Sequence, residues 1–320
     1  MLYHVFHRTL ILRPWIQCAK RSTATASQER IRNNLNVIDF FHPSLSSNSY
    51  RYTLQLGVSG YPKRGKVVES QDDGIYSSVQ VGDDAYFKRH DALGIADGVG
   101  GWRTHAGANP ALYSRKLMHY AQLELDRIKT NVRPQQPRVN PDPVQVLENA
   151  YHLTTLDAQN EVQQKGIVGS TTACIAILSQ DELKIANIGD CGVSVIRKNN
   201  YIFRSEEQQH SFNFPYQLGT ASFDSPSDAQ QFTVKIEEDD IIVLGSDGLF
   251  DNLFDDEILE EIKASIEHTD SDHLIAAPQS ISDALAHRAR IGGKADDISV
   301  IVAIVKKDDQ LPEPSPPPLP

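Results

Sequence analysis

The sequence predicts an α+β protein in which antiparallel sheets pack against helices. Apolar runs rich in β-branched residues recur along the chain, and turn residues bound most of them, as is typical of strands. These runs come in hairpin-like groups, with pairs of helical patterns between the groups. Because strands and helices do not alternate strictly, a parallel Rossmann-type sheet is disfavoured.

The individual elements follow from periodicity and from turn residues. The predicted strands cover residues 54–58, 93–96, 171–178, 183–187, 193–196, 232–236, 241–244 and 299–305. Apolar residues at helical spacing predict four helices. They lie after Pro110 through Ile128, from about Pro143 through Thr154, over 257–266, and over 281–290, where Gly292-Gly293 ends the last one.

The first 28 residues differ in composition from the rest. They contain four basic residues and no acid, since Glu29 is the first acidic residue. Apolar residues at helical spacing come first, and a run of Ser, Thr and Ala follows at 22–27. This pattern is typical of a mitochondrial transit peptide. A secretory signal is the alternative, but Arg13-Pro14 interrupts its apolar core. We therefore predict a transit peptide and flexible leader at 1–34, read by the mitochondrial import machinery, and location in the mitochondrial matrix.

Composition excludes several other classes of protein. The net charge of −11 disfavours binding along a nucleic-acid backbone. No uninterrupted apolar stretch is long enough for a transmembrane helix. Three widely spaced cysteines favour a reducing compartment over a disulfide framework or a zinc site. Residues 309–320 are proline-rich and predict an extended solvated tail, with an SH3 or WW ligand as the alternative, which leaves 35–308 for the folded domain.

Aspartates lie at the ends of three apolar runs. Asp97 follows one run, Asp247 follows another, and Asp296-Asp297 precede the last. Strand ends are where a fold brings distant residues together, and a buried carboxylate is costly unless a positive charge lies beside it. The sequence shows no matching cluster of Lys or Arg, so these acids indicate bound cations. Carboxylate ligands without His or Cys suit Mg or Mn. The alternative is a set of turn aspartates, because Asp-Gly is a common turn pair.

Further acids extend this set. Asp83-Asp84 precede a strand-like stretch, Asp190 follows the run 183–187, and Asp251 lies four residues after Asp247. Taken in order, these segments resemble the metal-dependent protein phosphatase (PPM) family. The matching segments, which span roughly residues 50–306, are Asp83 to Ala85, Ala96 to Gly101, Gly169 to Ala173, Asn187 to Asp190, Gly245 to Asp251 and Ala295 to Val300. Two further segments, Asp97 to Arg103 and Ser205 to Leu218, resemble the branch of the mitochondrial Ptc-seven homologues.

The resemblance implies a four-layer αββα sandwich of two antiparallel sheets flanked by antiparallel helix pairs. It also implies a site for two Mn or Mg ions at one edge of the sandwich. By their positions in the motifs, Asp97 would bridge both ions and the Gly98 carbonyl would bind one of them. Asp247 and Asp296 would hold one ion, and Asp83 would hold the other, directly or through water. The remaining assignments are a third, weaker ion at Asp190 and Asp251, and a water molecule oriented by Asp84.

Two positions depart from the family pattern. Many members have a general-acid His where this chain has Val99, and a phosphate-binding Arg where it has Val79. We assign the phosphate contact to Arg103, because a guanidinium fork matches phosphate, and a structural ion pair is the alternative. Water or His210 would protonate the leaving oxygen, although a lone His is more often structural.

Three rival interpretations remain to be weighed. Cys191 and Arg197 formally match the Cys-x5-Arg loop of cysteine phosphatases, but the residues between them resemble a strand, which would separate the two ends. An aspartyl phosphatase of the haloacid type would need an acid at Leu249. An inactive PPM-fold scaffold that binds phosphoproteins is the third, and such relatives usually lack metal carboxylates.

The sequence thus predicts a mitochondrial serine/threonine phosphoprotein phosphatase that uses water activated by two metal ions. The resemblance implies phosphorylated mitochondrial proteins as substrates, including enzymes of coenzyme Q biosynthesis.

Overall fold

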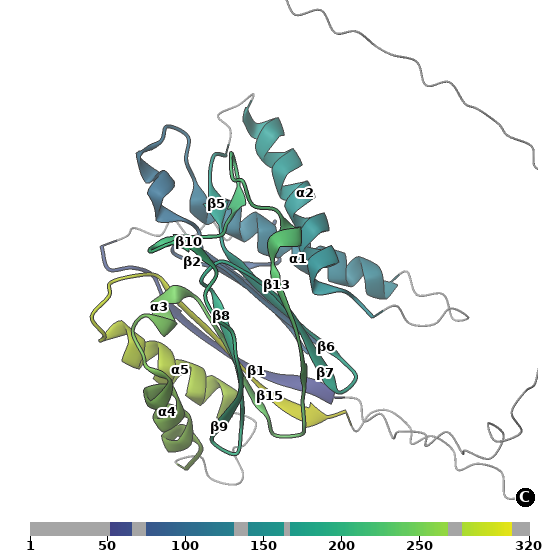
Figure 1. Cartoon of the computed structure of the whole chain (residues 1–320), viewed down its shortest axis with the longest axis vertical. Coiled ribbons are helices and arrows are strands. Elements are labelled where there is room, and N and C mark those ends of the chain that lie inside the picture. The colour runs from purple at the N-terminus through teal and green to yellow at the C-terminus, as the bar shows by residue number, and fades with distance from the viewer. Residues whose placement is uncertain (1–51, 66–74, 131–139, 163–166, 268–276, 309–320) are drawn as a thin grey trace, which may run out of the picture. The chain divides into compact units, whose positions relative to one another are not determined.

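In the computed structural model, two antiparallel sheets lie face to face between two pairs of helices (Figure 1). The structure describes residues 52–65, 75–130, 140–162, 167–267 and 277–308, all of which belong to one compact unit, Asn48–Pro320. The predicted leader at 1–34 and tail at 309–320 lie outside the described residues, so the domain boundaries stay predictions.

The sheets are built from neighbours that all pair antiparallel. The six-stranded sheet has the order β13 (Gln230–Lys235), β7 (Glu182–Ile188), β6 (Ala173–Ser179), β4 (Ala92–Ala96), β3 (Asp84–Arg89) and β2 (Val79–Val81). The five-stranded sheet has the order β1 (Tyr52–Tyr61), β15 (Ile298–Lys307), β14 (Ile241–Gly245), β8 (Gly192–Arg197) and β9 (Asn200–Arg204). Two short pairs join β10 (Gln209–Ser211) to β11 (Phe214–Pro215) and β12 (Leu218–Gly219) to β5 (Ser170–Thr171).

Each sheet has a helix pair on its outer face. The helices α1 (Pro110–Thr130) and α2 (Pro143–Val162) cover the six-stranded sheet, and α4 (Asp255–Glu267) and α5 (Ala277–Arg290) cover the five-stranded sheet. Both α1 and α2 begin at a proline, which lacks the amide that would have no partner there. Acids open α4 and basic residues close α5, as the helix dipole favours. Short turns of helix complete the fold: α3 (Asp247–Phe250), η2 (Gly100–Thr104) and η3 (Pro226–Asp228).

Most of the hydrophobic core lies in three layers that alternate with the backbone layers. Between the sheets, Ile95 and Ile185 of one sheet pack with Val195 and Ile301 of the other. A second layer lies under α1 and α2, and a third lies under α4 and α5. Burial of apolar surface on both faces of both sheets explains why most of the central strands are continuous Val/Ile/Ala runs.

The predicted αββα sandwich is confirmed, as are the predicted strands and the four helices. The sequence did not predict β2 or β9 to β12, which are short. All of these except the buried β12 are exposed or only partly buried. Helix α5 begins at Ala277 rather than near Ile281, because Ala277 and Pro278 are buried at the start of the helix. Within the described part of the chain, no helix is long and apolar enough to cross a membrane.

Close contact between β1 and α5 depends on Gly57. A Cβ at Gly57 would lie 2.1 Å from the backbone carbon of Pro278. Because backbone cannot move aside as a flexible side chain can, we expect Gly57→Ala to lower the free energy of unfolding by about 2–3 kcal/mol, as for other overpacked cores. Urea unfolding would measure this. Gly101→Ala is the control, since a Cβ there meets nothing closer than 4.0 Å. Equal stability of both variants would show that the helix can move away from the strand.

Candidate metal centre

Carboxylates gather at the ends of strands from both sheets. In the six-stranded sheet, Asp84 opens β3, Asp97 follows β4 and Asp190 follows β7. In the five-stranded sheet, Asp247 follows β14 and Asp296 precedes β15. The strong apolar character of these strands fixes their register, and the register in turn brings the acids at their ends together.

The backbone around Asp97 and Gly98 is held by several hydrogen bonds. The Asp97 carbonyl accepts from the Thr172 amide at 2.9 Å and from the Thr171 hydroxyl at 2.7 Å. The Gly98 amide donates to the Asp83 carbonyl at 3.1 Å. Two of the predicted metal-binding segments, Asp83-Asp84 and Asp97-Gly98, are therefore in direct contact.

Burial and mutual repulsion act on the central acids. Burial, followed by the charges of Asp84 and Asp247, raises the pKa of Asp97 well above its usual range. Asp84 is fully buried, and burial together with the charge of Asp297 raises its pKa in the same way, which the nearby hydroxyls of Ser246 and Ser299 offset only in part. Neither carboxylate oxygen of Asp84, nor Oδ1 of Asp247, has a hydrogen-bond partner of ordinary geometry.

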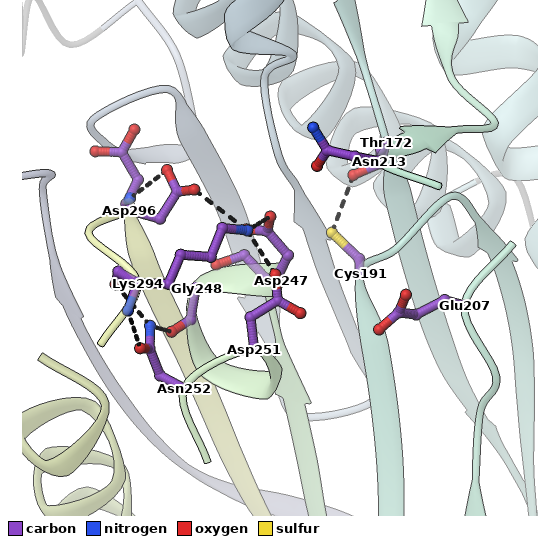
Figure 2. A network of polar contacts seen from close by, with 12 residues as sticks. Thr172, Cys191, Glu207, Asn213, Asp247, Gly248, Asp251, Asn252, Lys294 and Asp296 are labelled. Atoms are coloured by element: carbon purple, nitrogen blue, oxygen red, sulfur yellow. Dashed lines mark hydrogen bonds and ion pairs between the residues drawn. The ribbon is translucent and has the colours of Figure 1, made fainter. Parts of the chain in front are cut away.

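Acids at the rim of this centre add to the negative charge. Burial and the charge of Asp247 raise the pKa of Asp190 to about 7. Glu207, in the segment between β9 and β10, faces the same centre, and burial together with the charge of Asp251 raises its pKa (Figure 2). Sequence reasoning did not single out Glu207, because it lies outside any strand end and no spacing links it to the other acids.

Lys294 lies among the carboxylates, which the sequence analysis did not foresee. Its Nζ donates at 2.5 Å to both Asp247 Oδ2 and Asp251 Oδ2, and it lies 3.4 Å from Asp296 Oδ2 (Figure 2). Burial alone would lower the pKa of Lys294, but the contacts with Asp247 and Asp251 raise it instead. The sequence analysis expected no matching cluster of Lys or Arg. The structure places two ammonium groups at these acids, because Lys63 Nζ also lies 3.4 Å from Asp296 Oδ1.

Asn252 holds Lys294 in this position. The Asn252 side chain accepts from the Lys294 amide and donates to the Lys294 carbonyl, both at 2.9 Å. It also donates to the Gly248 carbonyl at 3.0 Å, in the short helix α3 that carries Asp247. This amide thus joins α3 to the loop before β15.

Asp297 ties three segments of the site together. Its Oδ1 accepts from the Lys63 amide at 2.6 Å, and its Oδ2 accepts from the Asp83 amide at 3.0 Å. Gly82 makes this possible, because its φ of +65° is open to glycine and a Cβ there would overlap the Asp297 carboxylate. Asp297 therefore positions Asp83, whereas the sequence assigned no separate role to it.

The donor set fits bound divalent cations. Buried carboxylate oxygens without hydrogen-bond partners, on Asp84 and Asp247, are the ligands that hard cations such as Mg and Mn prefer. Crowded carboxylates are costly without positive charge beside them. In the ranges that the structure describes, no three Asp, Glu, His or Cys side chains already stand at metal-binding distances, and the cations among these acids are Lys294 and, at Asp296, Lys63.

The residues considered for proton transfer and phosphate contact are placed as follows. Arg103 lies in η2, but its side chain is outside the described part of the structure, so its role stays a prediction. Val99 follows the Asp97-Gly98 segment, and its amide donates to the Ser170 carbonyl at 2.9 Å. His210 Nε2 lies 2.9 Å from Asp224 Oδ1, and its ring stacks on Tyr216. These contacts favour a structural role for His210.

The cysteine-phosphatase interpretation is excluded by the strand β8. Residues 192–197 are extended, so Cys191 and Arg197 stand at its two ends and cannot form one phosphate loop. Arg197 pairs with Asp240 at 2.7 Å. Burial, followed by the charges of Asp97 and Asp190, raises the pKa of the Cys191 thiol well above its usual range, which disfavours the thiolate.

Comparisons with known proteins point to one family. A sequence profile described as stage II sporulation protein E (SpoIIE) matches residues 119–306. The Xenopus laevis "Protein phosphatase PTC7 homolog" is 35% identical over 292 residues, which cover 81% of this chain and 91% of that protein. The Arabidopsis thaliana "Probable protein phosphatase 2C 55" is 37% identical over 244 residues. This chain spans about half the length of that protein and of a second Arabidopsis relative, 48% and 54% respectively.

Solved structures share the fold. The photosystem II phosphatase PBCP is 32% identical, has a TM-score of 0.59, and covers 79% of this chain and 99% of its own. The catalytic domain of the serine/threonine phosphatase PstP, crystallised with two manganese ions, has a TM-score of 0.54 over 79% of this chain and 99% of its own, and at 16% identity shows the fold alone. The matching profile, the relatives that this chain covers over most of their length and the shared sandwich all indicate the same family. The chain belongs to the PPM family of protein phosphatases, also called protein phosphatase 2C.

Proposed function

We propose that this protein is a metal-dependent phosphatase that hydrolyses phosphoserine and phosphothreonine in proteins. The observation that carries the proposal is the crowding of Asp84, Asp97 and Asp247 at one edge of the sandwich. Asp84 is fully buried, and buried oxygens of Asp84 and Asp247 have no hydrogen-bond partner of ordinary geometry. Relatives named as protein phosphatases support the same activity.

The cofactors that we propose are two Mn or Mg ions, with a third, weaker ion at the rim. Asp83, Asp97, the Gly98 carbonyl, Asp247 and Asp296 would hold the pair, and Asp190 and Asp251 the third. When bound, such cations lower the pKa of a water molecule and stabilise the charge that develops on the phosphoryl oxygens.

The protein's own residues would supply positioning and proton transfer. Asp84 would accept a hydrogen bond from the attacking water, and its full burial fixes its orientation. Asp297 holds the Asp83 amide and so fixes the segment that carries Asp84. Val99 has no proton to give, so we propose that a solvent water protonates the leaving serine or threonine oxygen. Arg103 would bind the phosphoryl oxygens through its guanidinium fork.

Hydrolysis of p-nitrophenyl phosphate and of a phosphothreonine peptide by the full chain tests the activity. We expect turnover with Mn or Mg and none in EDTA. We also expect Cys191→Ser to keep its activity, because the Cys191 thiol is buried and protonated and takes no part in the reaction.

Two results would contradict this proposal. Folded protein without turnover in any metal would favour the inactive scaffold that binds phosphoproteins. Activity that resists EDTA and disappears in Cys191→Ser would require a thiol mechanism instead.

We also propose that the protein acts in the mitochondrial matrix on phosphorylated matrix proteins, including enzymes of coenzyme Q biosynthesis. The basic, acid-free composition of residues 1–28 supports the location, and the resemblance to the mitochondrial branch supports the substrates. Import of the full chain into isolated mitochondria tests the location. We expect replacement of Arg8, Arg13, Lys20 and Arg21 by Gln to prevent import, and equal import of both chains would rule out this leader as the signal.

A further inference from the structure

A pocket lies beside the carboxylate centre, between the end of β1 and the loop that joins α5 to β15. It is lined by Tyr61, Arg64, Arg290, Gly293, Lys294 and Asp296, among others. Its volume of about 120 Å³ has room for several water molecules or for one small anion. Lys294 and Asp296 belong both to this pocket and to the carboxylate centre, so the two sites are adjacent.

The two arginines of this pocket are held in place by neighbouring groups. The Arg290 guanidinium carbon lies 4.4 Å from the centre of the Tyr61 ring, a cation–π contact. Arg64 donates from its guanidinium to the Arg290 carbonyl at 3.2 Å, at the C-terminal end of α5. Stacking and a single backbone contact leave most of the guanidinium N–H donors available, because each guanidinium carries five.

Neither arginine pairs with an acid that the structure describes. In the described part of the chain, Arg64 and Arg290 make no ion pair with a carboxylate. Other arginines do so throughout the fold, namely Arg89, Arg127, Arg197, Arg204 and Arg288. In a chain of net charge −11, two guanidinium groups that pair with none of the described carboxylates form a local anion-attracting surface next to the carboxylate centre.

The wall of the pocket is fixed close to the centre. Lys63 donates its amide to Asp297 and its Nζ to Asp296, so the residue before Arg64 is tied to the segment before β15. On the opposite side, a Cβ at Gly293 would meet nothing within 4 Å, so the chain leaves this wall open to solvent. Because Lys294 and Asp296 line both sites, this opening lies next to the carboxylate centre.

We propose that Arg64 and Arg290 form a second anion-binding site, which takes an acidic or phosphorylated residue of the substrate next to the phosphoresidue that is hydrolysed. This inference rests on the proposed phosphatase activity and gives the substrate class as phosphoproteins with a second negative charge near the target residue. A carboxylate and a phosphate group share the relevant chemistry, because both are oxyanions that accept bidentate hydrogen bonds from a guanidinium group.

Peptides that differ at one position test this proposal. One phosphothreonine peptide would be made with Glu, phosphoserine or Ala at each nearby position in turn, and kcat and KM measured with the full chain. At one or more positions we expect a lower KM for Glu and for phosphoserine than for Ala. In the double variant Arg64→Gln, Arg290→Gln, we expect the KM of those acidic peptides to rise about tenfold, from two exposed charge contacts.

The controls separate this effect from damage to the enzyme. The KM for the Ala peptide and turnover of p-nitrophenyl phosphate, which has no second charge, are expected to be unchanged in the double variant. Arg288→Gln is the matched control, because Arg288 lies on the same helix but pairs with Glu257 and Glu261. It is expected to leave the preference for acidic peptides intact.

Equal KM values for acidic and neutral peptides in the wild-type protein would overturn the anion site, as would an equal loss for all peptides in the double variant. Calorimetry in EDTA measures binding of the same peptides without turnover. It therefore distinguishes failure of the anion site from failure of the proposed phosphatase activity. An acid preference in binding that the double variant lacks, without any turnover, would support the anion site and contradict the phosphatase. No preference in binding or in turnover would contradict the anion site alone.

Discussion

Replacing Asp97 by Asn is expected to abolish hydrolysis and, at the same time, to stabilise the metal-free protein. Burial, followed by the charges of the nearby Asp84 and Asp247, raises the pKa of Asp97. Removing one of these charges relieves repulsion, so we expect the free energy of unfolding in EDTA to rise by roughly 1–2 kcal/mol. Removing a group that only hydrogen-bonds to a metal ligand lowers activity by up to about 100-fold. Asp97 is proposed to bind both cations directly, so we expect Asp97→Asn to lower metal-dependent turnover by at least that factor.

Excess Mn should reverse the order of stability. A ligand that binds only the folded state stabilises it, so Mn should raise the melting temperature of the wild-type protein more than that of Asp97→Asn. Thermal unfolding in EDTA and in Mn, with turnover measured in parallel, would check both effects. Asp181→Asn is the control, because Asp181 is an exposed acid paired with Lys235. Asp97→Asn protein with normal turnover, or with reduced stability in EDTA, would show that Asp97 is not part of a crowded cation site.

Continuous apolar patterning made the main strands and the position of the acids predictable. β14 and β15 are buried along almost their whole length, and their sequences contain few residues besides Ile, Val, Ala, Leu, Gly and Ser. In a sandwich, such runs form central strands that are buried on both faces, so the acids at their ends lie at its edge. That rule predicts from the sequence that Asp97, Asp247 and Asp296 lie at one edge.

The residues that sequence reasoning missed depend on single side-chain contacts across long separations. Lys294 reaches the carboxylates because Asn252, forty-two residues earlier, holds its backbone. Asp297 and Asp296 are neighbours in sequence, yet Asp297 is buried and binds the amides of Lys63 and Asp83. The contacts of the Lys294 and Asp297 side chains do not follow from hydrophobic periodicity, because the loop before β15 has no periodic pattern.

Sequence patterns also could not predict the shortest strands or the pocket that contains Arg64 and Arg290. The strands β10 to β12 contain two or three residues each, too few for a period to show. The pocket formed by Arg64 and Arg290 joins residues more than two hundred positions apart, and only the pairing of β1 with β15 and the packing of α5 bring them together.

Lys294→Met is expected to destabilise the metal-free protein and to make it depend on added metal. In EDTA, the Lys294 ammonium offsets the charges of Asp247 and Asp251, and it shares Asp296 with Lys63. Breaking a buried charge pair by removing one partner costs about 3–5 kcal/mol, and about 2 kcal/mol is a fair expectation here, because 35% of the Lys294 side chain is exposed. Chemical unfolding in EDTA would measure the loss.

Metal binding should change in the opposite direction. Without an ammonium to displace, Asp247 and Asp251 are free to bind a divalent cation, so we expect tighter binding of Mn by calorimetry and a larger rise in melting temperature on adding it. Lys235→Met is the matched control, because Lys235 also contacts two acids, Asp181 and Glu182, but on an exposed surface, where such pairs contribute little. If Lys294→Met lost no more stability in EDTA than Lys235→Met and bound Mn no more tightly than the wild type, then Lys294 would not act as the resident cation of this site, and the carboxylates would have to be balanced by protonation instead.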